Sequence, residues 1–198
     1  MSTLSVSLAG NNLEWRLPSR GRVGMYCLIG AEAAIFTIFV VAYLFYVGKS
    51  VGGPNPKNVL HAPLFYTVCL LASSVTIHVA LRRLVEGNIA AFARLWLLTI
   101  FLGGTFLFGT AREWVQLIFQ DGLTIRTNLF GTTYYSLVGL HAFHVTMGLL
   151  ALIIVAMFHF AARLRREHTE RLEVLSMYWH FVDAVWVVVF LVVYVIGV

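Results

Sequence analysis

The chain has 198 residues, of which 60% are hydrophobic and only 12% are charged, whereas soluble globular domains carry roughly 25% charged residues. This composition excludes a soluble globular domain and indicates an integral membrane protein. The formal net charge of +5 does not indicate nucleic-acid binding, because lysine and arginine lie at the ends of apolar runs, where they report membrane orientation.

The N-terminal segment, residues 1–22, contains no apolar core of signal-peptide length, so we expect a cytoplasmic tail. Five apolar runs follow it, and each is long enough for the ~20 residues that a helix needs to cross the hydrocarbon. Backbone groups in lipid must bond internally, and the runs lack the alternation of barrel strands. The sequence therefore predicts an all-α integral membrane bundle of five transmembrane helices in residues 23–198. The expected spans are 23–47, 61–81, 93–114, 132–160 and 177–197.

Basic residues are unevenly distributed between the two sides of this predicted bundle. With the N-terminus in the cytoplasm, ten of the 14 lysine and arginine residues lie on the cytoplasmic side. Loops on that side usually carry the basic excess. We therefore expect a multi-pass protein with a cytoplasmic N-terminus and a C-terminus on the opposite, periplasmic side.

Glu32 is an acidic residue inside the first predicted span. It lies about nine residues into the helix, or ~13 Å along the axis, where an ionisable group costs about 2.5–3.5 kcal/mol on insertion scales. Gly30 and Ala34 are four residues apart, so we expect another helix to approach closely beside the carboxyl. Two interpretations stay open: a protonated glutamate hydrogen-bonded within the bundle, or a protonatable site coupled to proton traffic.

Two histidines lie in the fourth predicted span. His141 and His144 are three residues apart and form one stripe with Gly148, and this stripe is expected to face protein rather than lipid. Counted from opposite membrane edges, His144 and Glu32 reach about the same depth. A contact between Glu32 and a histidine is therefore geometrically possible.

The fifth predicted span repeats the three-residue spacing. His180 and Asp183 lie close to its predicted cytoplasmic edge, and Trp179 and Trp186 share a face with Asp183. The two tryptophans are candidate anchors for a lipid or for a partner interface. The two polar residues join Glu32 as buried groups that are either protonatable or structural.

The histidines raise the question of a bound haem or metal. Bis-histidine haem needs two facing histidines at one depth, but His144 has no histidine partner at mid-depth, and the others lie at or beyond the cytoplasmic boundary: His78, His159, His168 and His180. A copper site needs soft ligands in a compact group, and "HAFHVTMG" is a weak candidate. We therefore expect hydrogen-bonded structural histidines, no catalytic residue, and no metal or redox cofactor bound by this chain. A haem-b anchor near the inner edge is a third hypothesis.

A stand-alone proton-coupled transporter is the alternative class. Transporters commonly use repeats and helices that are broken in mid-span. No internal repeat is evident in this sequence, and its prolines lie outside the predicted spans or in the first turn of the second span. The pattern disfavours a transporter.

Two long motifs resemble a known family. "GTTYYSLVGLHAFHVTMG" resembles the glycine and histidine signature of subunit III of haem–copper terminal oxidases, and "YWHFVDAVWVVVFLVVYVIG" resembles that family's closing helix. "IGAEAAIF", "LLASSVTIHVA" and "WLLTIFLGGTFLF" extend the resemblance over about 23–198. Glu32 matches the family's buried acidic position. The residues that match its signature positions are His141, His144, His180 and Asp183.

The resemblance implies a non-catalytic integral subunit of the five-span bacterial form, found in cytochrome c and quinol oxidases of the respiratory chain. Such a subunit lies in the bacterial inner membrane and packs against the haem-bearing subunit I and other oxidase subunits. Haem and copper are expected in those partners. This chain is expected to bind phospholipid and to sustain proton uptake into subunit I during aerobic electron transport. The same family includes a homologue associated with nitric oxide reductase, which is the alternative within the family.

Two positions differ from the family pattern. Ala142 replaces a glycine between the paired histidines, which exchanges one small residue for another. Thr110 stands where the family usually has Gln or Glu, three residues before Glu113. This difference weakens the expectation of a polar network through Thr110.

Overall fold

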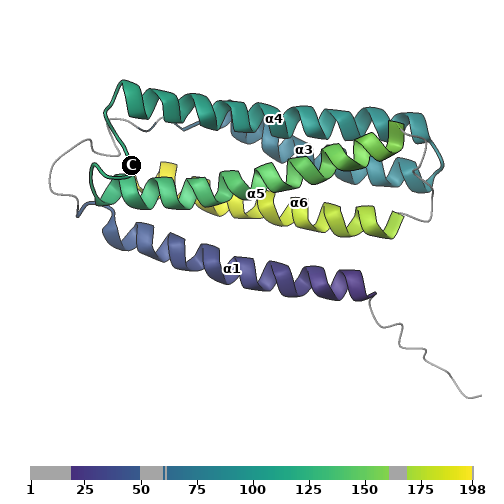
Figure 1. The fold of residues 1–198 in the computed structure, drawn as a ribbon, viewed down its shortest axis with the longest axis horizontal. Helices are drawn as coiled ribbons and strands as arrows, with labels where there is room; N and C mark the ends of the chain where they lie inside the picture. The colour runs from purple at the N-terminus through teal and green to yellow at the C-terminus, as the bar shows by residue number, and fades with distance from the viewer. Residues whose placement is uncertain (1–18, 50–59, 61, 161–168, 198) are drawn as a thin grey trace, which may run out of the picture.

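The computed structural model describes residues 19–49, 60, 62–160 and 169–197, which form a bundle of long helices (Figure 1). The helices are α1 (Arg20–Tyr46), α3 (Leu64–Val85), α4 (Ile89–Phe119), α5 (Leu129–Phe160) and α6 (Thr169–Phe190), and α6 continues as the π-helical turn η2 (Leu191–Ile196). Within these described ranges, five helices are long and apolar enough to cross a membrane. The predicted all-α class with five spans is confirmed.

Two helices extend well beyond the apolar runs that predicted them. α4 continues to Phe119 instead of ending near 114, and α6 begins at Thr169 instead of 177. Both extensions contain glutamate, glutamine, arginine or leucine, which are good helix formers. A helix can therefore continue past the hydrocarbon, where hydropathy no longer reports it. The expected connector "RLRREHTERLEV" is helical from Thr169 onward.

A short turn makes α3 and α4 an antiparallel hairpin. The Asn88 side chain accepts a hydrogen bond from the backbone N–H of Ala91 at 3.0 Å and caps the start of α4. Gly87 before it has φ +83°, a left-handed conformation that only glycine adopts without steric cost. Because the connection is so short, the two helices pack along their length.

The remaining contacts close a four-helix arrangement with one helix added at its side. α4 packs on α5, α5 on α6, and α6 on α3. α1 packs on α5 and α6, and Figure 1 shows it on the side of the bundle away from α4. α1 buries only Phe36 and Tyr43, whereas α6 buries eight residues.

One end of the bundle carries most of the described arginines. α1, α4 and α6 begin there, and α3 and α5 end there. We call this end the basic end. Its arginines are Arg20, Arg22, Arg82, Arg83, Arg94 and Arg171.

Close packing around one indole fixes α6 within the bundle. Trp179 is fully buried between Gly103 of α4 and Gly148 of α5, and a Cβ added at either glycine would lie 2.9 Å from its ring. The indole N–H donates to Ser73 Oγ of α3 at 2.9 Å, and the Ser73 hydroxyl donates to the Leu70 carbonyl at 2.5 Å. Small residues let helices approach in lipid, so α6 here contacts three neighbours through one side chain.

Candidate functional site

Glu32 of α1 and His144 of α5 form a polar pair inside the bundle. The Nε2 atom of His144 lies 3.1 Å from Oε2 of Glu32, and their side chains are 8% and 22% exposed. The Phe36 ring packs 5.1 Å from the His144 ring, and the Tyr178 hydroxyl of α6 donates to the His144 carbonyl at 3.1 Å. The contact expected between Glu32 and a histidine is present, and it joins α1 to α5.

The second ring nitrogen of His144 determines how protons are arranged in this pair. Nδ1 lies 2.7 Å from the Leu140 carbonyl oxygen. A carbonyl oxygen only accepts, so Nδ1 carries a hydrogen and donates it. Nε2 and the Glu32 carboxyl then share one proton: either a protonated carboxyl donates to Nε2, or an imidazolium donates to a carboxylate. Both forms have zero net charge, which a low-dielectric interior tolerates best.

The small residues near Glu32 do not lie beside its carboxyl. Gly30 and Ala34 are both exposed, and a Cβ added at Gly30 would meet nothing within 4 Å. Positions two apart on a helix point about 200° away from each other, so the Gly30 and Ala34 face lies opposite the Glu32 side chain. A helix does lie beside the Glu32 carboxyl, as expected, but it is α5 on the face opposite the small residues, and Gly30 and Ala34 do not create that approach.

His141 lies one turn from His144 but contacts other helices. It is fully buried and stacks on the Trp186 ring of α6 at 4.9 Å, with Phe106 of α4 edge-on at 5.8 Å. Neither of its ring nitrogens has a hydrogen-bond partner among the described residues. The stripe through His141, His144 and Gly148 does face protein, as predicted. The expectation that every histidine is hydrogen-bonded is wrong for His141, because aromatic rings surround it.

His180 and Asp183 of α6 meet at Ser74 of α3. The Ser74 hydroxyl lies 2.9 Å from Nδ1 of His180 and donates to Oδ2 of Asp183. His180 is about 11 residues from the start of α6, or ~16 Å along the axis, farther from the helix end than the predicted boundary implied. The sequence analysis did not assign Ser74, although two adjacent serines in an apolar run were a signal.

Trp179 and Trp186 lie in the interior rather than on the surface where an anchor would be. Their exposed fractions are 0% and 1%. The indole N–H of Trp186 donates to Thr67 of α3 at 3.2 Å, as that of Trp179 donates to Ser73. Both tryptophans therefore fasten α6 to α3, which corrects their expected place at a lipid or partner interface.

A separate polar cluster lies at the end opposite the basic end. The Glu113 carboxylate of α4 accepts hydrogen bonds from the hydroxyls of Tyr194 at 2.8 Å and Tyr134 at 3.2 Å. The Thr110 hydroxyl instead donates to the Phe106 carbonyl of its own helix at 3.2 Å. A polar network therefore exists near Thr110, but the Thr110 hydroxyl takes no part in those bonds. The sequence did not reveal the two tyrosines, because both lie far from Glu113 along the chain.

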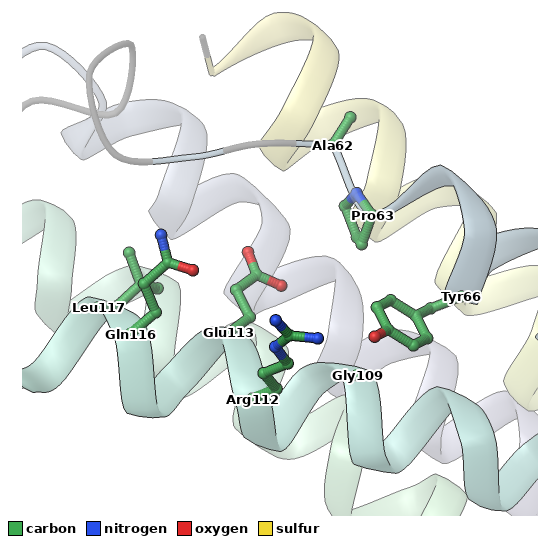
Figure 2. A pocket seen from close by; sticks show the side chains of 8 residues that line it. All are labelled: Ala62, Pro63, Tyr66, Gly109, Arg112, Glu113, Gln116 and Leu117. Carbon is green, nitrogen blue, oxygen red and sulfur yellow. The ribbon is translucent and has the colours of Figure 1, made fainter. Parts of the chain in front are cut away.

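A cavity of about 260 Å³ adjoins this cluster and lies between the start of α3 and the end of α4. Figure 2 shows Arg112, Glu113 and Gln116 projecting from α4 toward Ala62 and Pro63. The full lining is Ala62, Pro63, Tyr66, Gly109, Arg112, Glu113, Gln116 and Leu117. Charged and amide groups at a bundle end are suited to the headgroup region.

The described histidines near the basic end lie in two separate places. His78 lies beside His180, with 6.4 Å between ring centroids, and His159 packs edge-on against Phe92 at 5.8 Å. His168 lies outside the described residues. Over the part of the chain that the structure describes, no three His, Cys, Asp or Glu side chains are grouped so that they could hold a metal ion.

Comparisons with known proteins give one consistent result. Residues 20–198 match the family model described as Cytochrome c oxidase subunit III. Cytochrome c oxidase subunit 3 of Bacillus sp. (strain PS3) is 31% identical over 178 residues, which cover 88% of this chain and 85% of that protein. Cytochrome bo(3) ubiquinol oxidase subunit 3 of Pseudomonas aeruginosa is 31% identical over 177 residues, which cover 88% of this chain and 84% of that protein.

A longer relative is covered to a smaller extent by this chain. Cytochrome c oxidase subunit 3 of Heterololigo bleekeri is also 31% identical, over 87% of this chain but only 69% of that protein. The two bacterial proteins above are thus closer to this chain in length. The match of residues 20–198 shows that this chain belongs to the cytochrome c oxidase subunit III family.

Proposed function

We propose that the chain is an accessory integral subunit of a haem–copper terminal oxidase, in which other subunits carry the haems, the copper and the oxygen chemistry. The names of its relatives, as subunits of cytochrome c and ubiquinol oxidases, support membership of such a complex. These names do not favour a stand-alone proton-coupled transporter. By itself the chain is non-catalytic and binds no redox cofactor.

The observation that carries the proposal is the Glu32–His144 pair. It places a titratable carboxyl and an imidazole 3.1 Å apart within two helices of membrane-spanning length. Since the pair shares one proton, it can pass that proton between its carboxyl and its imidazole without a change in the net charge of the pair. A supporting subunit that sustains proton uptake by its partner needs a protonatable group of this kind, and Glu32 belongs to α1, the helix whose opposite face we assign to that partner.

α1 offers the surface that subunit I would cover. Its exposed face carries Gly30 and Ala34, where a neighbouring helix can approach closely. A groove of about 350 Å³ between α1 and α6, lined by residues such as Phe36, Val40 and Val189, is suited to an acyl chain of a phospholipid. We propose that subunit I packs on the face with Gly30 and Ala34, and that a phospholipid occupies the groove between α1 and α6.

The orientation has its own test. The basic end carries six described arginines, and arginine and lysine accumulate on the cytoplasmic side. We propose a cytoplasmic N-terminus. A cysteine introduced at Ser5 should be labelled only from the cytoplasmic side, and one at Arg126 only from the periplasmic side. The reverse result would refute this topology.

Affinity purification tests the assignment to an oxidase. A tag on this chain should recover a larger haem-containing subunit in mild detergent, and the visible spectrum of the complex should be lost when the chain is isolated alone. Cross-linkers on the exposed face of α1 should capture that subunit. Recovery of the chain without any haem-containing partner would contradict the proposal, and a Soret band in the isolated chain would contradict its lack of haem.

The Glu32→Gln variant tests the supporting role. It keeps the shape of the side chain and should assemble normally, because an amide can still hydrogen-bond Nε2. Oxygen reduction should persist in the assembled complex, while proton uptake or the lifetime of turnover declines. Complete loss of oxygen reduction in a fully assembled variant would mean that Glu32 lies on an obligatory path.

A further inference from the structure

A cavity of about 500 Å³ lies at the basic end, between the end of α3 and the first part of α6. Its polar lining comes from His78 and Arg82 of α3, from Glu86 directly after α3, and from Glu173, Ser176 and His180 of α6. Arg82 and Glu86 are exposed. Arginine and glutamate side chains at a span end extend into the headgroup region and water, so the mouth of the cavity meets the aqueous phase.

A line of hydrogen bonds leads from this cavity into the bundle. His180, which lines the cavity, places Nδ1 2.9 Å from the Ser74 hydroxyl. Ser74 donates to Oδ2 of Asp183, which is 3% exposed. The other oxygen of Asp183, Oδ1, has no hydrogen-bond partner among the described residues. An unpartnered oxygen on a buried carboxylate is costly while the group is charged, and a proton that arrives at Oδ2 removes that charge.

The single hydroxyl hydrogen of Ser74 determines the tautomer of His180. Because Ser74 donates that hydrogen to Asp183, it must accept from His180, so Nδ1 carries a hydrogen. In the neutral ring, Nε2 is then left with a free lone pair. Nε2 is the nitrogen of this cavity-lining side chain that can bind a proton.

We propose that His180, Ser74 and Asp183 form a proton relay that transfers protons between the aqueous phase at the basic end and the buried carboxyl of Asp183. A proton from water adds to Nε2 of His180. The Nδ1 hydrogen moves to Ser74 Oγ, and the Ser74 hydrogen moves to Asp183 Oδ2. His180 ends neutral with its hydrogen on Nε2, Ser74 ends neutral, and the Asp183 carboxylate becomes a carboxylic acid. One proton is gained in all, and the reverse sequence returns it.

Both glutamates that line the cavity are paired with an arginine. Glu173 is paired with Arg22 of α1 at 2.6 Å, and Glu86 is paired with Arg83 at 2.9 Å. His78 lies 6.4 Å from His180 between ring centroids, and Arg82 is the cationic group of the lining.

The Glu32–His144 pair contacts α6 through Tyr178 and not through a residue of the relay. Its contact there is the hydrogen bond from Tyr178 to the His144 carbonyl. Tyr178 is two positions from His180 and so lies about 200° around the helix from it. The relay is therefore distinct from the Glu32–His144 pair and does not rest on the proposed oxidase role.

Infrared spectroscopy of the full chain in phospholipid vesicles tests the relay. After a jump to lower pH, wild type should gain the carbonyl-stretching band of a protonated carboxyl, and this band should shift in D2O. Asp183→Asn should lack the band, whereas Glu32→Gln should retain it. If the band persists in Asp183→Asn, the proposal is refuted, and its loss in Glu32→Gln would identify Glu32 as the group that takes up the proton.

The rate at which the band appears tests the path and does not require the Asp183 variant to fold. Ser74→Ala removes the bridging hydroxyl and should lower the rate at which the band appears on the order of 100-fold. Ser74→Thr keeps a hydroxyl at this position, and its band should appear at the wild-type rate. Thr76→Ala is the matched control, because the Thr76 hydroxyl is on the same helix as Ser74 but bonds Thr99 of α4 at 2.7 Å, outside the relay. Equal rates in wild type and Ser74→Ala would overturn the relay.

Discussion

α1 and α6 are both apolar helices of membrane-spanning length, but they are held in the bundle in different ways. α6 is held by close packing of the Trp179 indole against two glycines, and by hydrogen bonds from the Trp179 and Trp186 indoles to α3. Among the described residues, α1 buries only two and carries two interhelical polar pairs, Glu32–His144 inside the bundle and the more exposed Arg22–Glu173 at the basic end. Since lipid is as apolar as a helix face, apolar area alone drives little association between helices. The comparison teaches that attachment depends on close packing or on polar bonds.

Removing the Trp179 indole should have the largest effect. Trp179→Ala leaves a cavity among α3, α4 and α5 and should lower the free energy of unfolding by about 3–5 kcal/mol. Unfolding in mixed micelles with increasing denaturing detergent measures it. Phe101→Ala is the control, because Phe101 is an aromatic residue of α4 that is 69% exposed. Similar losses in both variants would refute attachment by shape.

Adding one methyl group at Gly103 should have the next largest effect. A Cβ there would lie 2.9 Å from the buried Trp179 ring, so Gly103→Ala should cost about 1–3 kcal/mol through overpacking. Gly104→Ala should cost nothing or stabilise slightly, because a Cβ there meets nothing within 4 Å and alanine favours helix by up to ~1 kcal/mol. The same unfolding measurement compares the adjacent positions, and equal effects would show that the glycine contact is unimportant.

Breaking the Glu32–His144 pair should loosen α1 while the other helices stay packed. Glu32→Ala leaves Nε2 of His144 without its partner, at a cost of about 1–3 kcal/mol. Spin labels on Cys27, which is exposed on α1, and on a Met147→Cys site of α5, with Cys69 replaced by alanine, should report a broader distance distribution. Glu32→Gln should retain the narrower distance distribution of the unaltered pair. An unchanged distribution in Glu32→Ala would mean that α1 is held by other contacts.

Tyr178→Phe should have the smallest effect. It removes one hydrogen bond, from the hydroxyl to the His144 carbonyl, and should cost about 0.5–1.5 kcal/mol. The unfolding measurement should show this loss with the spin-label distances unchanged, because the Glu32–His144 contact remains. A broadened distribution would show that Tyr178 positions the pair as well as joining α6 to α5.

The candidate site was predictable where depth along a helix decides proximity. Glu32 and His144 were expected at one depth because helix rise converts sequence position into distance from the membrane edge, and the two side chains meet. Depth does not specify direction around the bundle. The sequence analysis therefore misplaced the Gly30 and Ala34 face, and it assigned Trp179 and Trp186 to an outer surface when both lie inside.

Composition and the lengths of the apolar runs by themselves determined an all-α membrane bundle with five spans, since lipid requires every backbone group to bond within its own helix. Motifs near the paired histidines determined the family resemblance. Only the tertiary structure decided which polar groups meet: Ser74 with His180 and Asp183, and Glu113 with Tyr134 and Tyr194. These groups come from separate helices, and their contacts depend on how each helix is rotated about its axis. That rotation is selected by the packing of all the helices together, and no single span encodes it.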